Sequence, residues 1–184
     1  MNYENQINEI NNKYNQLKTE YEENINNNKI IHQTKNYNNG KYEGELKNEK
    51  REGKGIYFWN DGNKYEGQFK NNKREGKGIM FYNNGNRYEG EYKNDKIDGK
   101  GIYYFKNGSR YEGEFKNDKR EGKGIIYYND GSRYEGDYQN DKKEGKGLFY
   151  YQNGDREMGD YLNGNKIGKH ITLKNNGEVE TNEY

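Results

Sequence analysis

The first part of the chain carries apolar residues at a helical period. Apolar and aromatic side chains recur at intervals of four and three residues, at Tyr3, Ile7, Ile10, Tyr14, Leu17 and Tyr21. This spacing places them along one side of an α-helix, as a heptad seam. The seam then meets Asn24 and Asn28. The pattern therefore predicts a helix over about residues 3–23 and a loose Asn-rich linker over residues 24–39.

A helix of this length is marginally stable alone in water, because short helices depend on tertiary packing. We therefore expect the seam to be buried, either on a sheet of the same chain or in a second copy. A free coiled coil is the less favoured alternative, because Asn24 and Asn28 interrupt the heptads.

From residue 40 onward the apolar period becomes that of β-strands. Within residues 111–133, Tyr111, Gly113 and Phe115 share one face of a predicted strand, with charged residues on the other. A polar turn is predicted over residues 117–121. A second strand follows, with Gly122, Gly124, Ile126 and Tyr128 on one face. Such a unit predicts a β-hairpin.

This unit is repeated along the chain. Tyr-Glu-Gly recurs every 23 residues, at Tyr42, Tyr65, Tyr88, Tyr111 and Tyr134. A constant period of this length indicates a repeat array, and a degenerate sixth copy from Glu157 suits a terminal cap. The predicted fold is mainly β, a single-layer antiparallel β-meander of repeated hairpins with an N-terminal α-helix. Its parts are the helix and linker (1–39), the meander (40–179) and a tail (180–184).

Glycines at fixed places in each copy need a packing reason, because glycine weakens a strand. Without a Cβ they leave hollows on which aromatic rings can lie. We therefore predict a repeated core of ring and glycine, formed by Tyr65, Gly67, Tyr88, Gly90, Tyr111, Gly113, Tyr134 and Gly136.

Three glycine motifs keep their mutual spacing through five copies, as in Tyr88-Glu89-Gly90, Gly99-Lys100-Gly101 and Asn107-Gly108. Over residues 42 to about 177 this sequence resembles the MORN (membrane occupation and recognition nexus) repeat family. In the first copy Leu46 stands where the family has an aromatic residue. The resemblance implies a single-layer β-meander used in scaffolding, self-association, cytoskeletal or ciliary assemblies and membrane-adjacent proteins. It does not imply catalysis.

Composition supports a thin aromatic core. Hydrophobic residues make up 27% and charged residues 34% of the chain, a balance that favours disorder, but 15% are aromatic. The net charge of +1 lacks the basic excess of a nucleic-acid-binding protein. There is no cysteine, no apolar run long enough to span a membrane and no signal peptide. We expect a cytoplasmic protein, associated with cytoskeleton or membrane.

Candidate chemistry is sparse. Two serines and two histidines, Ser109, Ser132, His32 and His170, offer no catalytic triad. The Gly53-Lys54-Gly55 motif and its copies lack the spacing of a phosphate-binding loop. We therefore predict a non-enzymatic protein without catalytic residues, cofactor or metal.

Two surfaces are candidates for binding. An apolar stripe is left on the face opposite the core and would bind protein, at Ile56, Phe58, Ile79, Phe81, Ile102, Tyr104, Ile125, Tyr127, Leu148 and Tyr150. Basic residues cluster near the hairpin tips, at Lys47, Lys50, Arg51, Lys54, Lys70, Lys73, Arg74 and Lys77. They either bind acidic phospholipid or keep an edge charged against unwanted strand pairing.

The sequence thus favours an interaction scaffold that binds protein partners or itself. The alternative is a peripheral membrane module that binds acidic phospholipids. A third class, the regulatory module of a separate enzyme, is suggested only by the family resemblance. We expect no nucleic acid partner and no transmembrane segment.

Overall fold

The computed structural model describes residues 3–184, with side chains described for residues 8–26 and 29–184. One helix, α1 (Tyr3–Asn28), precedes a sheet of fourteen strands. The strands are β1 (Ile31–Tyr37), β2 (Gly40–Lys47), β3 (Lys50–Trp59), β4 (Lys64–Lys70), β5 (Lys73–Phe81), β6 (Arg87–Lys93), β7 (Lys96–Tyr104), β8 (Arg110–Lys116), β9 (Lys119–Tyr127), β10 (Arg133–Gln139), β11 (Lys142–Tyr150), β12 (Arg156–Leu162), β13 (Asn165–Leu173) and β14 (Val179–Glu183).

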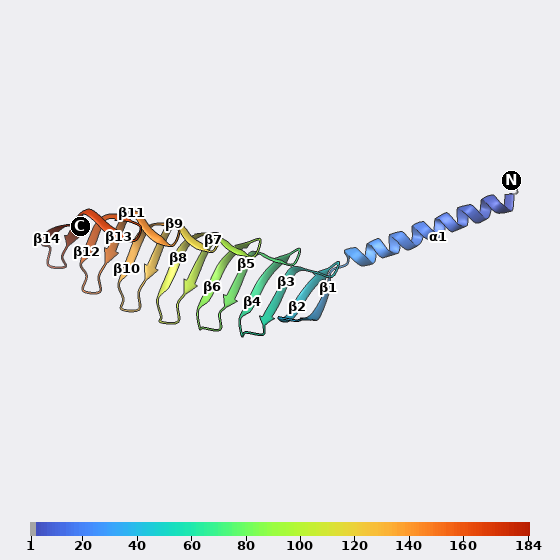
Figure 1. Cartoon of the computed structure of the whole chain (residues 1–184), viewed down its shortest axis with the longest axis horizontal. Coiled ribbons are helices and arrows are strands. Elements are labelled where there is room, and N and C mark those ends of the chain that lie inside the picture. The colour runs from blue at the N-terminus through green and yellow to red at the C-terminus, as the bar shows by residue number, and fades with distance from the viewer. Residues whose placement is uncertain (1–2) are drawn as a thin grey trace.

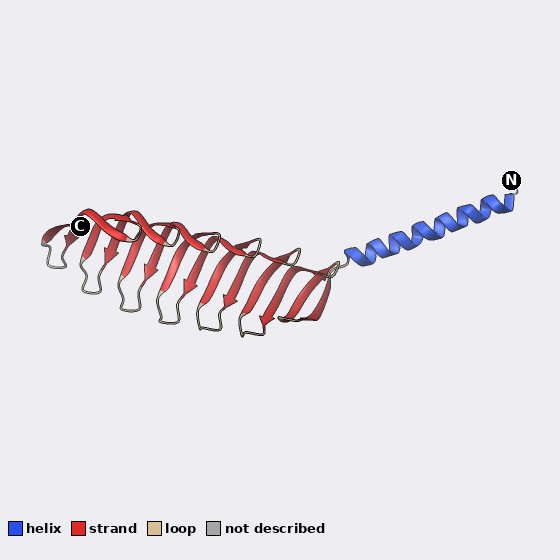
Figure 2. Cartoon of the chain, in the orientation of Figure 1, coloured by secondary structure: helices blue, strands red, loops and turns tan. Residues whose placement is uncertain are grey.

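The strands lie in chain order and each pairs antiparallel with the next (Figure 1). The sheet is a single layer with α1 beyond its first strand, as the secondary-structure colouring shows (Figure 2). The predicted fold class, a β-meander of hairpins with an N-terminal helix, is confirmed.

The hairpin turns are tighter than the sequence predicts. A turn over residues 117–121 is wrong, because β9 already begins at Lys119. Only Asn117 and Asp118 form the turn, with φ of 50° and 68°. Asn and Asp tolerate this left-handed region, and two such residues match the twist of the flanking strands.

The two glycines of each Gly-x-Gly motif have different roles. Gly122 has a φ of 63° and lies where the pairing of β8 with β9 shifts register after Gly113. It therefore serves a β-bulge. Gly124 pairs with Gly113, and a Cβ on it would lie 2.3 Å from the Tyr111 hydroxyl oxygen. The second glycine therefore makes room for a ring.

The core is a line of rings on one face of the sheet, which we call the core face. Tyr111 is fully buried, and its ring meets Phe115 and Tyr138 edge to face at centroid distances of 5.2 and 5.0 Å. Its hydroxyl donates to the Glu114 carbonyl at 3.2 Å. Tyr65, Tyr88 and Tyr134 occupy the same place in their copies, and all are fully buried.

Both ends of the sheet hold a strand that the sequence did not predict. The expected loose linker is wrong for residues 31–37, which form β1 and pair with β2. The expected tail at residues 180–184 lies mostly in β14, which pairs with β13. Each addition satisfies the backbone groups of a repeat strand that would otherwise be an unpaired edge.

Helix α1 is longer than the predicted helix and ends at Asn28, not near residue 23. The chain has no proline, and its first glycine is Gly40, so no strong helix breaker occurs earlier. Asn costs less than about 0.7 kcal/mol per exposed helical position, which does not end a helix. Helical pairs such as Gln16 to Glu20, at 3.1 Å, add support.

Candidate interaction surfaces

The seam of α1 is not covered by the sheet. Ile10, Tyr14, Leu17 and Tyr21 are 67%, 64%, 56% and 67% exposed, and the helix extends away from β1 (Figure 1). The side chains of Tyr3 and Ile7 lie outside the described residues. Docking of the helix on the sheet of its own chain is therefore not seen, and burial in a second copy stays a prediction.

The predicted apolar stripe lies on the face opposite the core, which we call the outer face. Its ten residues are all half-buried: Ile56, Phe58, Ile79, Phe81, Ile102, Tyr104, Ile125, Tyr127, Leu148 and Tyr150. Basic side chains cover its aromatic members. The Arg110 guanidinium lies 3.8 Å from the Tyr127 ring centre, and Arg133 lies 3.7 Å from that of Tyr150. Only the aliphatic half of the stripe stays open.

A groove follows this aliphatic half across the strands. It has a volume of about 960 Å³, and Ile79, Ile102 and Ile125 line it beside the paired glycines. Glu66, Glu89 and Glu112 flank the isoleucines, and a row that includes Lys77, Lys100, Glu91 and Glu114 forms the opposite wall. A neighbouring hollow extends it past Ile125 to Leu148 and Met158. The glycines leave this concave apolar floor because they carry no side chain.

The eight predicted lipid-binding residues do not form one surface. Lys47 pairs with Lys50, and Lys70 with Lys73, across their hairpins beside the two-residue turns. Lys93 pairs with Lys96 in the same way, as does Lys116 with Lys119, so lysine pairs line the row of tips. Lys54 and Lys77 lie farther along their strands, beside the groove.

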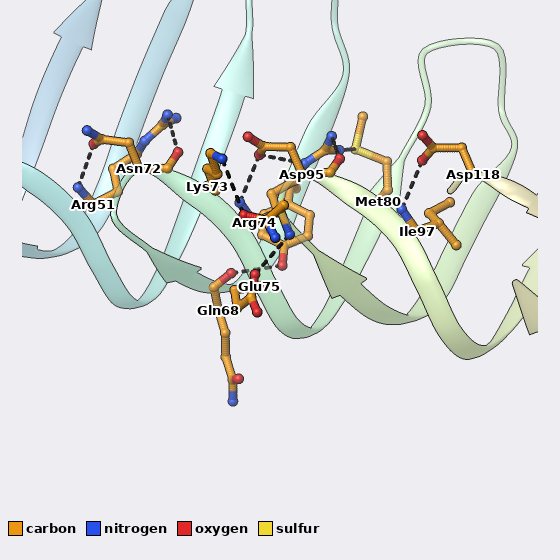
Figure 3. Close-up of polar contacts among 12 residues, drawn as sticks. Arg51, Gln68, Asn72, Lys73, Arg74, Glu75, Met80, Asp95, Ile97 and Asp118 are labelled. Atoms are coloured by element: carbon orange, nitrogen blue, oxygen red, sulfur yellow. Dashed lines mark hydrogen bonds and ion pairs between the residues drawn. The ribbon is translucent and has the colours of Figure 1, made fainter. Parts of the chain in front are cut away.

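Arg51 and Arg74 point to the core face and not to the tips. The Arg74 guanidinium lies 5.1 Å from the Tyr92 ring centre, and its Nε donates to Asp95 Oδ1 at 3.4 Å (Figure 3). The Arg51 guanidinium lies 4.9 Å from the Tyr57 ring centre. The tip lysines also do not protect an unpaired strand, as one alternative proposed, because the outermost strands are β1 and β14.

Backbone and side-chain bonds tie neighbouring tips together. Asp95 Oδ1 accepts the backbone N–H of Arg74 at 2.8 Å, and the Asn94 N–H donates to Glu75 Oε2 at 2.9 Å (Figure 3). Asp118 Oδ1 accepts the Ile97 N–H in the same way, at 2.9 Å. These bonds fix the position of each hairpin relative to the previous one.

A buried polar cluster closes the aromatic core at its C-terminal end, and the sequence reasoning missed it. His170 is fully buried and lies over Gly159, where a tyrosine ring lies in the other copies. Its Nε2 bonds the Asp160 carbonyl at 2.9 Å, and its Nδ1 lies 3.0 Å from Glu157 Oε1. The available signal was His170 at the place of Gly147 in the preceding copy, 23 residues earlier.

Charges in this region are perturbed by burial and by their partners. Burial would raise the pKa of the Glu157 carboxyl, but bonds from Lys166 and Tyr151 outweigh it and hold the pKa below its ordinary value. Lys143 lies 4.0 Å from the Tyr134 ring centre, and burial lowers its pKa to about 8. These groups close the stack and lie outside the outer-face groove.

Two solved structures have a loosely similar fold. The chain is similar to the TCP domain of SAS-4 (dCPAP) from Drosophila melanogaster, solved with a proline-rich motif of Ana2, with 17% identity and a TM-score of 0.42. That match covers 72% of this chain and 85% of the other. The TCP10 domain of Danio rerio CPAP matches with 12% identity and a TM-score of 0.46, covering 77% and 66%. No curated protein sequence matches significantly.

Within residues 3–184, no helix is both long enough and apolar enough to cross a membrane. The MORN repeat model matches five consecutive segments, at residues 42–64, 65–87, 88–110, 111–133 and 134–156. The degenerate sixth copy lies outside the match. These five segments cover more than half of the sequence, in the register of the ring and glycine core. The chain therefore belongs to the MORN repeat family, and its sheet is a repeat scaffold.

Proposed function

We propose that the protein is an interaction scaffold that self-associates, with α1 of one copy lying in the outer-face groove of another. The observation that carries this proposal is the presence of two uncovered apolar surfaces in one chain. The seam of α1 is more than half exposed at Ile10, Tyr14, Leu17 and Tyr21. The groove presents Ile79, Ile102 and Ile125 on the face opposite the core.

The spacings of the two surfaces agree. Equivalent isoleucines lie two strands apart, about 9.6 Å at 4.8 Å per strand. Equivalent seam positions lie seven residues apart, about 10.5 Å at 1.5 Å per residue. Ile10 and Leu17, or Tyr14 and Tyr21, can therefore contact successive isoleucines.

Charge supports the same pairing. Lys13 and Lys18 lie about 70° to either side of the seam at 100° per residue. The two walls of the groove carry Glu89 and Glu112 on one side, and Glu91 and Glu114 on the other. A docked helix would place a lysine next to each wall. Family resemblance alone suggests a cytoskeletal, ciliary or membrane-adjacent setting for this assembly.

Light scattering of paired variants tests the proposal. Wild-type protein should exceed the monomer mass, and Leu17→Arg and Ile102→Arg should each be monomeric, because each places a charge in the apolar contact. An equimolar mixture of the two variants should associate again, since an intact helix then meets an intact groove. Asn12→Arg, on the opposite side of the helix, is the matched control and should keep the wild-type mass.

The outcomes separate this contact from a coiled coil. Helix–helix pairing would be abolished by Leu17→Arg and untouched by Ile102→Arg. A monomeric wild-type protein, or association that survives Ile102→Arg, contradicts docking in the groove. Circular dichroism of each variant checks that the sheet is still folded.

A second candidate function, contact with acidic phospholipid, is favoured by the lysine pairs at the tips. The acidic groups between them are already engaged: Asp95 bonds Arg74, and Glu75 accepts a backbone N–H. We expect binding to phosphatidylserine vesicles that is weak at about 150 mM salt and stronger at lower salt, because exposed charges are screened.

The lipid test compares two sets of four substitutions to alanine. Lys70, Lys73, Lys93 and Lys96 lie at the tips, whereas Lys54, Lys77, Lys100 and Lys123 lie beside the groove. Vesicle sedimentation should decrease only for the tip set. Arg74 is left unchanged because it is packed among rings. Strong binding at about 150 mM salt that depends on the tip set would make the membrane the main partner; equal losses from both sets would contradict a tip site.

A further inference from the structure

One repeat lacks a side chain that its neighbours have. Counted from the first tyrosine, the tenth position of five copies is basic, at Arg51, Arg74, Arg120, Lys143 and Lys166. In the third copy this position holds Ile97.

The arginines on both sides of this copy define what the position binds. The Arg74 guanidinium lies between Trp59 and Tyr92, 6.0 and 5.1 Å from their ring centres, and bonds Asp95 at a side-chain oxygen and at the carbonyl. Arg120 repeats this arrangement. It lies 5.2 Å from the Tyr138 ring centre and donates to Asp141 Oδ1 at 3.2 Å and to the Asp141 carbonyl at 2.7 Å.

In the third copy the same surroundings remain around a shorter side chain. Tyr82, Phe115 and Asp118 stand where Arg74 has Trp59, Tyr92 and Asp95. Together with Tyr103 and Phe105 they line a pocket of about 460 Å³ above Ile97 on the core face. Figure 3 shows Asp118 bonded only to the backbone of Ile97, whereas Asp95 also bonds the Arg74 side chain.

The charge of this pocket is that of a cation site. Among the described residues, no basic side chain forms an ion pair with Asp118. Arg120 and Asp141 also line the pocket, and they neutralise one another at 3.2 Å. Asp118 therefore leaves one net negative charge beside three or four ring faces, which attract a cation.

We propose that this pocket, which we call the Ile97 pocket, binds the guanidinium of an arginine presented by a partner polypeptide. The bound arginine would repeat the contacts of Arg74 and Arg120, stacking on Tyr82 and Phe115 and donating to the carboxylate and carbonyl of Asp118. A planar guanidinium serves two acceptors while it stacks on a ring.

The chain itself distinguishes arginine from lysine at this position. Arg74 and Arg120 each face an aspartate of the next turn, whereas Lys143 faces Gly164 at that place. The third copy keeps the aspartate that accompanies arginine. The Ile97 pocket is on the core face, so it is independent of the proposed groove contact on the outer face.

The test is titration with the peptide acetyl-Gly-Arg-Gly-amide, followed by NMR of the full chain. Saturable shifts should occur at Ile97, Asp118 and Phe115, and not at Asp95, whose site Arg74 already fills. The same peptide with citrulline, a neutral isostere of arginine, should bind about tenfold more weakly, because charge-assisted bonds are about twice as strong as neutral ones. The lysine peptide should also be weaker.

Two variants make the result specific. Asp118→Asn keeps an oxygen for the Ile97 N–H but removes the charge, and it should weaken binding about tenfold. Ile97→Arg fills the pocket from within the chain and should abolish the shifts while the sheet remains folded by circular dichroism. The proposal is overturned if the arginine peptide gives no saturable shifts, if citrulline binds equally, or if Ile97→Arg binds as wild type does. Unfolding of Ile97→Arg would also overturn it, since the pocket would then not accept a guanidinium.

Discussion

Gly113→Val should lower the free energy of unfolding by about 3 kcal/mol or more. A Cβ at this position would lie 2.5 Å from the Tyr111 hydroxyl oxygen and 2.7 Å from the Gly124 Cα. Neither neighbour can move cheaply, because Tyr111 is fully buried and Gly124 is backbone paired to Gly113. Valine favours strands, so a simple propensity effect has the opposite sign.

Glu112→Val is the matched control, one residue earlier on the same strand. Glu112 faces the outer side, where its carboxylate is 2.6 Å from Arg110 Nε and both side chains are more than a third exposed. An exposed ion pair contributes about 0 to 1 kcal/mol, so this change should be small. Thermal melts compare the two variants, and equal shifts of the midpoint would refute the packing of rings on glycines.

The sequence predicts the repeating part of this fold because one physical constraint recurs there. Tyr111 needs the bare backbone of Gly113 and Gly124, and the pair recurs every 23 residues with no insertion. Strand β1 carries no such constraint. Its apolar residues are Ile31 at one end and Tyr37 at the other, and its position follows from pairing with β2. A strand determined by its neighbour leaves little signal in its own residues.

The candidate surfaces were predicted only in part, for a related reason. Lys50 and Arg51 are adjacent in sequence and were assigned to one basic edge. Because β3 begins at Lys50, they point to opposite faces, and Arg51 lies beside the ring of Tyr57. The Ile97 pocket needs rings from two neighbouring copies, so its existence depends on the register between hairpins. Ile97 as the exception at its position is visible in the sequence, but the surrounding pocket is not.

The sixth copy should show strong coupling between Glu157 and His170. In the fifth copy a tyrosine, Tyr134, lies over Gly147; in the sixth, the glutamate and the ring have exchanged strands, with His170 over Gly159. His170→Gly removes the ring and leaves a buried carboxylate, and Glu157→Tyr brings a second ring to an occupied place. Each should cost about 2 kcal/mol.

The double variant, Glu157→Tyr with His170→Gly, restores the pair found in the other five copies. It should be within about 1 kcal/mol of wild type, which corresponds to a coupling of about 3 kcal/mol. Lys169→Gly, on the exposed side of the same strand, measures the cost of a glycine there. Additive effects of the two substitutions in denaturant melts would show that the exchange does not preserve a packing unit.

Acid stability gives an independent reading of the same cluster. The Lys166 ammonium and Tyr151 hydroxyl outweigh burial and hold the pKa of the Glu157 carboxyl below its ordinary 4.5. A carboxyl whose pKa is lower in the folded state stabilises the fold above the unfolded pKa, and that contribution is lost as the pH falls through the folded value. Wild type should therefore lose more stability below about pH 4.5 than the double variant, which has neither Glu157 nor His170. Parallel stability curves for the two proteins over this range would show that the buried carboxylate does not stabilise the C-terminal end of the sheet.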